Sequence, residues 1–85
     1  MNWHTIVDSV ARKQIKKFPR KEADHLVAVM VTLEQNPYEG DVVKLQGERD
    51  IWRRRVGSYR MFYEIHTQER IIYVFNIKRR TSSTY

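Results

Sequence analysis

Arginines are interleaved with aromatic residues over positions 44–63, and a second basic cluster occupies positions 78–85. Side chains at positions i and i+2 of a β-strand lie on one face, so Arg53 and Arg55 are expected to project together. Arg60 belongs to the next expected strand and is placed on the same surface. A guanidinium group presents a planar fork of N–H donors, and this fork matches the oxygens of a phosphate group. The segment therefore predicts a phosphate-binding surface.

The C-terminal cluster is expected to complete this surface. Arg79 would add another guanidinium group, and Tyr85 a planar ring that can stack on a nucleobase or use its hydroxyl in proton transfer. Phosphate-binding cations beside a stacking ring are what a single-stranded RNA site requires. Lys44, Lys78 and Arg80 are further basic residues expected to bind RNA.

Composition limits the possible functions. The chain has 85 residues, enough for one modest core, and is treated as a single domain over 1–85. Its formal net charge of +6 favours a polyanionic partner, either nucleic acid or an acidic protein. Cysteine is absent, and His4, His25 and His66 lack metal-ligand spacing, so neither a metal nor another cofactor is expected. The sequence has no signal peptide and no membrane-spanning apolar run, so a cytoplasmic protein without membrane contact is expected.

Helical periodicity is confined to the N-terminal half. The aromatic and β-branched run 3–7 predicts a strand. Asp8 or Ser9 is the expected N-cap of a first helix, which Pro19 closes. In the second helix apolar residues recur at i, i+3, i+4 and i+7, and the Asn-Pro pair at 36–37 ends it.

Strand patterns occupy the C-terminal half. Strands are expected at 51–56, 59–66 and 71–77, with a tight turn at 57–58 and another turn at 67–69. Two helices followed by such a meander predict an α+β domain. The two N-terminal helices would pack on one face of a small twisted, mainly antiparallel sheet and leave the other face free.

Three blocks of the sequence resemble the RelE/ParE superfamily of toxins from type II toxin–antitoxin systems. They are KLQG at 44–47, WRRRVGSYRMFYEI at 52–65 and the KRR…Y ending at 78–85. The resemblance covers nearly the whole chain and implies the RelE/ParE-like microbial RNase fold. RelE-like members cut mRNA in the ribosomal A site without a metal, whereas ParE-like members poison DNA gyrase. We expect the RelE-like branch, an endoribonuclease (mRNA interferase) in which the ribose 2′-oxygen attacks the adjacent phosphate.

The resemblance implies a catalytic set of five residues, Arg53, Arg55, Arg60, Arg79 and Tyr85. RelE-like toxins carry lysines at the positions of Arg53 and Arg55. A lysine can lose its proton when its pKa is depressed, whereas an arginine stays protonated. The two arginines are therefore expected to clamp phosphate, and the identity of the general base stays open.

Several neighbouring residues have competing interpretations. Some family members use a Glu/His/Arg set, and Glu64 and His66 lie close to Arg60 in the sequence. Glu64 is alternatively a structural carboxylate, paired with Arg60 on the same strand face. Three further residues are interpreted as structural: Arg54, Trp3 and Trp52.

The resemblance also implies partners. A cognate antitoxin, RelB-like or other, would neutralise the toxin through an acidic segment that folds on binding. The expected substrate is mRNA on the 70S ribosome, and operator DNA would be contacted only through the antitoxin. Two alternatives stay open: a ParE-like inhibitor of DNA gyrase, and a catalytically inactive co-repressor that binds the antitoxin.

Overall fold

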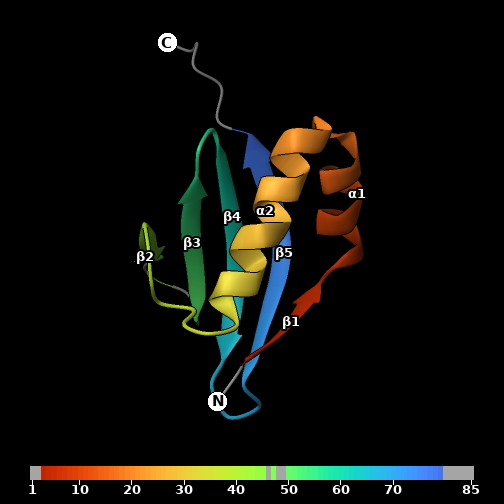
Figure 1. The fold of residues 1–85 in the computed structure, drawn as a ribbon. Coiled ribbons are helices and arrows are strands. Elements are labelled where there is room, and N and C mark those ends of the chain that lie inside the picture. Colours follow the sequence, from red (N-terminus) through yellow and green to blue (C-terminus); the bar gives the residue numbers. More distant parts are fainter. Residues whose placement is uncertain (1–2, 46, 48–49, 80–85) are drawn as a thin grey trace.

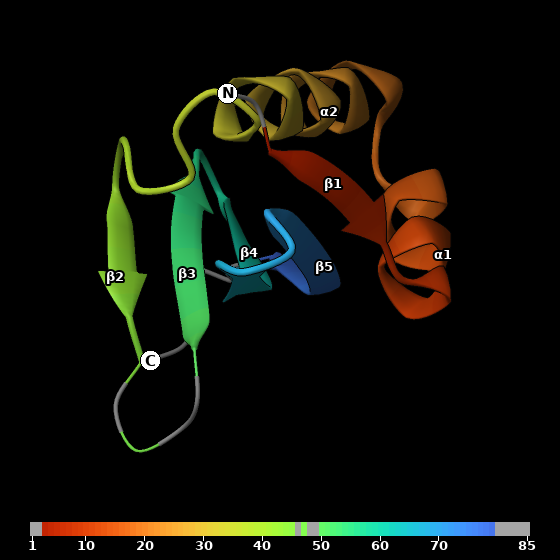
Figure 2. The ribbon, with the colours of Figure 1, turned by 90° about the horizontal axis from the view of Figure 1, so that it is seen from below.

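The computed structural model describes residues 3–45, 47 and 50–79, which form seven secondary-structure elements (Figure 1). In chain order these are β1 (His4–Val7), α1 (Ser9–Lys17), α2 (Arg20–Leu33), β2 (Val42–Lys44), β3 (Ile51–Val56), β4 (Tyr59–His66) and β5 (Ile71–Arg79). The strands form one sheet with the order β1-β5-β4-β3-β2. α2 lies over one face of the sheet, whereas α1 lies beside β5 beyond the end of β1 (Figure 1 and Figure 2).

Each helix boundary has a local physical cause. The side chain of Asp8 accepts a hydrogen bond from the backbone N–H two residues later, at 3.1 Å, and so caps α1. Pro19 disfavours helical backbone at the residue before it, and Phe18 is accordingly extended. Beyond α2, the backbone N–H of Tyr38 donates to the Asn36 side chain at 3.0 Å and turns the chain at the predicted Asn-Pro pair.

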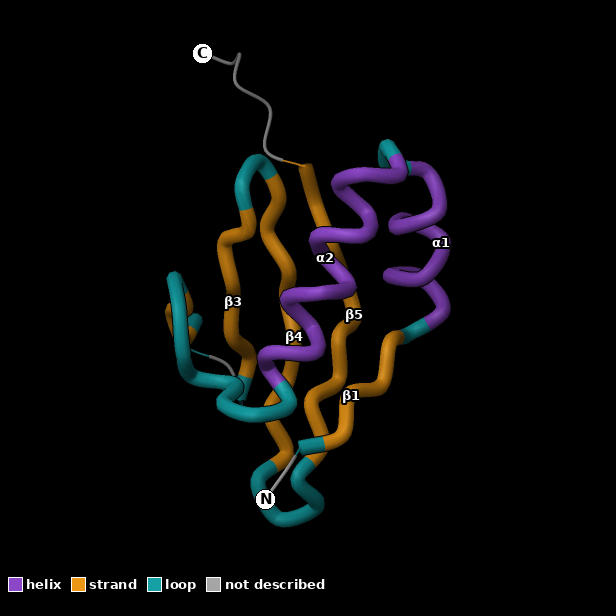
Figure 3. Tube along the Cα trace, viewed as in Figure 1, coloured by secondary structure: helices purple, strands orange, loops and turns teal. Residues whose placement is uncertain are grey.

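The pairing of β5 fixes the position of α1. β5 runs antiparallel to β4 on one side and parallel to β1 on the other, where β1 reaches only as far as Val74. Beyond that point the Gln14 side chain of α1 substitutes for a strand. Its oxygen accepts from the N–H of Ile77 at 2.8 Å, and its nitrogen donates to Asn76 at 2.9 Å. Figure 3 shows β1 leading directly into α1 beside this edge.

The sheet has one buried face and one face that the helices leave free. Along β4, the buried residues Met61, Tyr63 and Ile65 alternate with more exposed ones. We call their side of the sheet, which packs against the helices, the helix face. Residues paired directly across antiparallel strands share a face, which assigns the following residues to the opposite side, the open face: Arg53, Arg55, Arg60, Phe62, Glu64, His66 and Lys78.

The predicted fold class is confirmed, with two local differences. The sequence predicts no strand at 42–44, but β2 forms there as a three-residue edge strand on β3. β5 ends at Arg79 rather than at residue 77, so the last two described residues are part of the ladder. No helix in the described ranges is long and apolar enough to cross a membrane.

Candidate functional site

Three cations form a row across three strands of the open face. The register pairs Arg55 of β3 with Arg60 of β4, and Arg60 with Lys78 of β5. Side chains paired in this way start about 5 Å apart. We call these three residues the cationic row. The prediction that Arg55 and Arg60 share a surface is confirmed, and Lys78 lies in the same row.

Arg53 lies in the next row of the open face, paired with Phe62. Within the described part of the chain, neither Arg53 nor Arg60 forms an ion pair or a side-chain hydrogen bond. Both residues are only partly buried, yet their Nε atoms are shielded from solvent and have no hydrogen-bond partner. Their aliphatic stems therefore lie against the protein surface, and no described carboxylate competes for their guanidinium groups.

Arg55 has an internal anionic neighbour. Its Nε lies 3.6 Å from a carboxylate oxygen of Asp41, and its backbone N–H donates to the Asp41 carbonyl at 3.0 Å. Both side chains are largely exposed, and ion pairs of this kind contribute about 0–1 kcal/mol. A phosphate could therefore replace Asp41 as the partner of Arg55.

Lys44 does not join the open face. It pairs in register with Trp52, whereas its neighbour Val43 lies opposite Arg53. The Lys44 ammonium lies 5.9 Å from the centre of the Trp52 ring and 3.6 Å from an Asp50 carboxylate oxygen. A shift of one residue along a strand moves a side chain to the other face, so any RNA contact of Lys44 would lie outside the cationic row.

The expectation that Arg79 converges with the other arginines is wrong. Arg79 pairs with Tyr59 rather than with Arg60, and its guanidinium carbon lies 5.9 Å from the centre of the Tyr59 ring. The alternation that brings Lys78 onto the open face turns the next residue of β5 toward the helix face. Arg79 is exposed there, at the end of the strand.

The Tyr59 ring beside Arg79 joins the sheet to the helical hairpin. Its hydroxyl donates to Glu22 of α2 at 2.5 Å, and its centroid lies 4.5 Å from that of Phe18. The pKa of Tyr59 is raised, chiefly because its proton is held by the Glu22 carboxylate. The structure thus places Arg79 in a contact between sheet and helices.

Two residues of the predicted site, Arg80 and Tyr85, lie outside the described residues. Their roles stay predictions from the sequence.

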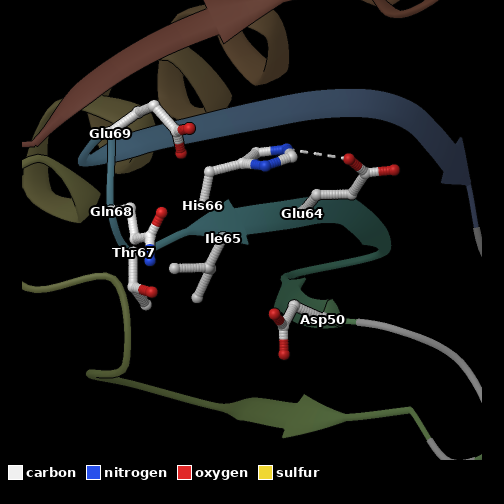
Figure 4. Close-up of a pocket in the computed structure, with 7 residues that line it drawn as sticks. All are labelled: Asp50, Glu64, Ile65, His66, Thr67, Gln68 and Glu69. Carbon is white, nitrogen blue, oxygen red and sulfur yellow. Dashed lines mark hydrogen bonds and ion pairs between the residues drawn. The ribbon is translucent and has the colours of Figure 1, made fainter.

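An acidic hollow of about 340 Å³ opens at the other end of β4 (Figure 4). It is lined by Asp50, Glu64, Ile65, His66, Thr67, Gln68 and Glu69. His66 Nε2 lies 2.9 Å from a Glu64 carboxylate oxygen, and no ion pair joins Glu64 to Arg60 among the described residues. Glu64 lies four residues from Arg60, about 13 Å along the strand. The structure therefore does not bring Glu64 and His66 to the cationic row.

The residues interpreted as structural make internal contacts. The Arg54 guanidinium donates to the Glu39 carbonyl at 2.7 Å and lies so close to Gly40 that a side chain there would collide with it. Trp3 and Trp52 both pack against the core. No cluster of three or more His, Asp or Glu residues in the described segments could hold a metal ion.

Phe62, for which the sequence predicted no role, lies among the arginines of the open face. Its cross-strand partner is Arg53, and Arg60 lies two residues before it on the same strand. The signal was present in the sequence, since a residue at i+2 from Arg60 must share its face.

A family model described as the ParE toxin of the type II toxin–antitoxin system parDE matches residues 3–83. A curated relative from Methanocaldococcus jannaschii, which carries the toxin name RelE1, is 26% identical over 83 residues. This alignment covers 94% of this chain and 92% of the relative.

Solved structures share the fold. The archaeal RelE–RelB complex from Pyrococcus horikoshii contains a chain that matches with a TM-score of 0.86 at 24% identity, covering 98% of this chain and 100% of that one. The toxin–antitoxin complex RelBE2 from Mycobacterium tuberculosis matches with a TM-score of 0.85 at 20% identity, covering 94% and 100%. At these identities the likeness concerns the fold alone.

Proposed function

Because the chain belongs to the ParE toxin family of type II toxin–antitoxin systems, within the RelE/ParE superfamily, we propose that its open face cuts mRNA in the ribosomal A site. The observation that carries the proposal is the cationic row, with Arg53 beside it. Arg53 and Arg60, which form no ion pair with a described residue, are suited to an external phosphate. Guanidinium–phosphate hydrogen bonds are charge-assisted and bidentate.

The proposed reaction needs no metal. The ribose 2′-oxygen attacks the adjacent phosphorus, the bond to the 5′-oxygen of the next nucleotide breaks, and a 2′,3′-cyclic phosphate and a free 5′-hydroxyl result. Negative charge accumulates on the phosphate oxygens in the transition state. Arg55, Arg60 and Lys78 would stabilise that charge, and fixed cations facing a developing charge are a principal source of rate enhancement.

We assign proton transfer to a side chain other than the arginines, which only supply charge. The 2′-oxygen must lose a proton and the 5′-oxygen must gain one. Arg53, Arg55 and Arg60 stay protonated. Lys78 is the member of the cationic row that can donate a proton, and we assign it the protonation of the leaving 5′-oxygen. The Tyr85 hydroxyl is the candidate for transfer of the 2′ proton.

An antitoxin is the expected protein partner. The structures from Pyrococcus horikoshii and Mycobacterium tuberculosis are toxin–antitoxin complexes, the first of RelE with RelB. We propose that this chain likewise binds a RelB-like antitoxin. A net charge of +6 favours an acidic segment in that partner.

The test is primer extension on a defined mRNA incubated with the protein, with and without stalled 70S ribosomes. Cuts in the A-site codon are expected only with ribosomes and are expected to weaken at least a hundredfold in Arg60→Ala. Arg20→Ala is the matched control, because Arg20 is an exposed arginine at the start of α2, away from the open face. Cleavage that survives in Arg60→Ala would reject the open face as the site.

Gyrase inhibition is the second candidate, favoured by the description of the matching family model as a ParE toxin. The two arginines at positions that carry lysine in RelE-like toxins also favour it. A supercoiling assay with purified DNA gyrase separates the two functions. Inhibition of supercoiling without ribosome-dependent cleavage would establish the ParE-like function and remove the proposal of RNA cleavage.

A further inference from the structure

A large apolar ring lies in the middle of the face that folding leaves free. Phe62 is partly exposed, and its neighbours Met61 and Tyr63 point to the helix face and are buried. Phe62 belongs neither to the buried core nor to the partly buried residues packed against it. Core packing therefore does not explain a phenyl ring at this position.

The surroundings of Phe62 combine a partly exposed ring with available positive charge. Arg53 lies directly across from it, and Arg60 lies two residues earlier on β4, about 7 Å along the strand. Within the described residues, no aromatic ring packs on Phe62 and no cation lies over it. An aromatic ring with one arginine across the strand pair and another two residues along its own strand matches a nucleotide, which has an aromatic base and an anionic phosphate.

We propose that Phe62 is the stacking platform for one nucleobase of a single-stranded RNA whose phosphate lies on the cationic row. This inference rests on the proposed function for the identity of the ligand and adds a base-binding site to it. Glu64 and Glu69 line the acidic hollow at the other end of β4, where their carboxylates would repel phosphate. The backbone of the RNA is thereby directed toward Arg60, and a base reaches Phe62. Every base has a π face, so the site accepts all four bases.

The experiment measures the affinity of the chain for a fluorescein-labelled single-stranded RNA hexanucleotide by fluorescence anisotropy at low salt. Phe62→Leu and Phe62→Met keep apolar bulk but remove the ring, and each is expected to weaken binding about tenfold. Phe62→Tyr keeps the ring and should bind as the unaltered protein does. Tyr38→Leu is the control, because it removes an exposed ring from the loop after α2, away from the open face.

A hexanucleotide of the same backbone without bases separates stacking from a general structural effect. Phe62→Leu should leave affinity for this abasic RNA unchanged, since no base remains to stack. The assignment of Phe62 would be overturned if Phe62→Leu lowered the affinity equally for the intact and the abasic RNA. It would also be overturned if Phe62→Leu and Phe62→Met both bound the intact RNA with full affinity. The arginine variant keeps the two proposals distinct. If Arg60→Ala weakens RNA binding but Phe62→Leu does not, only the proposed base site at Phe62 is rejected. If the unaltered protein and Arg60→Ala bind RNA equally weakly, RNA binding by the open face is rejected as well.

Discussion

At the scale of single residues, the arginines of the open face can stabilise charge but cannot transfer a proton, whereas a lysine can do both. Arg53, Arg55 and Arg60 supply permanent positive charge and planar donor forks, but none of them can release a proton. Lys78 stands in register with Arg60 and can do so. Under the proposed function, Lys78 would therefore add proton transfer to a face that otherwise only clamps phosphate.

The variant Lys78→Arg keeps the charge of the cationic row and removes its exchangeable proton. We expect the single-turnover rate of mRNA cleavage on 70S ribosomes to fall about 10²- to 10⁴-fold, with little change in RNA affinity. Lys44→Arg is the matched control, because Lys44 lies beside Trp52 and outside the row. An unchanged rate in Lys78→Arg would assign proton transfer elsewhere, with Tyr85 tested next.

The ion pair between Arg55 and Asp41 makes Asp41 an internal competitor of phosphate. Asp41→Asn removes this negative charge and should raise RNA affinity by up to about fivefold, the equivalent of an exposed ion pair. Asp24→Asn removes the same charge from an exposed pair with Arg20 on α2 and should leave affinity nearly unchanged. The comparison is made by fluorescence anisotropy. Equal effects of the two variants would mean that only net charge matters.

At the scale of elements, the type of each helix and strand could be predicted from the sequence more reliably than the sheet face on which its last residues lie. The helices and the strands at 51–56 and 59–66 carry clear periodicity, caps and turn residues, and they form as predicted. β2 has only three residues and owes its strand form to pairing with β3, which no local pattern reveals. The face of Arg79 depends on the β4–β5 register, which contains an irregularity between Phe62 and Tyr63. A long-range register of this kind is not readable from spacing within one strand.

Tyr63 links β4 to the turn after α2, and this link should weaken in alkali. Its hydroxyl donates to the Pro37 carbonyl at 3.1 Å, and burial raises its pKa to about 12 from 10.0. Because the pKa is higher in the folded state, the stabilisation is complete below pH 10 and is lost as pH rises through 12. Tyr63→Phe should lower the free energy of unfolding by about 1 kcal/mol at pH 7. It should also flatten the decline in that free energy between pH 10 and 12, as measured by urea unfolding. Parallel declines in the two proteins would contradict this assignment.

At the scale of the whole molecule, charge is distributed unevenly over the open face. The cationic row occupies one end, Arg53 lies in the next row with Phe62, and the acidic hollow opens at the other end of β4. Under the proposed function, such a surface would attract a polyanion and would also set which end the phosphates approach. The same end suits an acidic segment of an antitoxin, so RNA and antitoxin would compete for it.

The salt dependence of RNA binding tests this distribution of charge. Each phosphate contact on a single strand contributes about −0.7 to the slope of log affinity against log salt concentration. Four cations on the open face thus predict a slope near −3, measured by anisotropy over a salt series. Arg60→Ala should reduce the magnitude of the slope by about 0.7, whereas Arg20→Ala should leave it unchanged. Phe62→Leu should lower affinity at every salt concentration without altering the slope, because stacking releases no counterions. If Arg20→Ala and Arg60→Ala changed the slope of log affinity against log salt equally, RNA affinity would depend only on the net charge of the chain, and no face would be preferred.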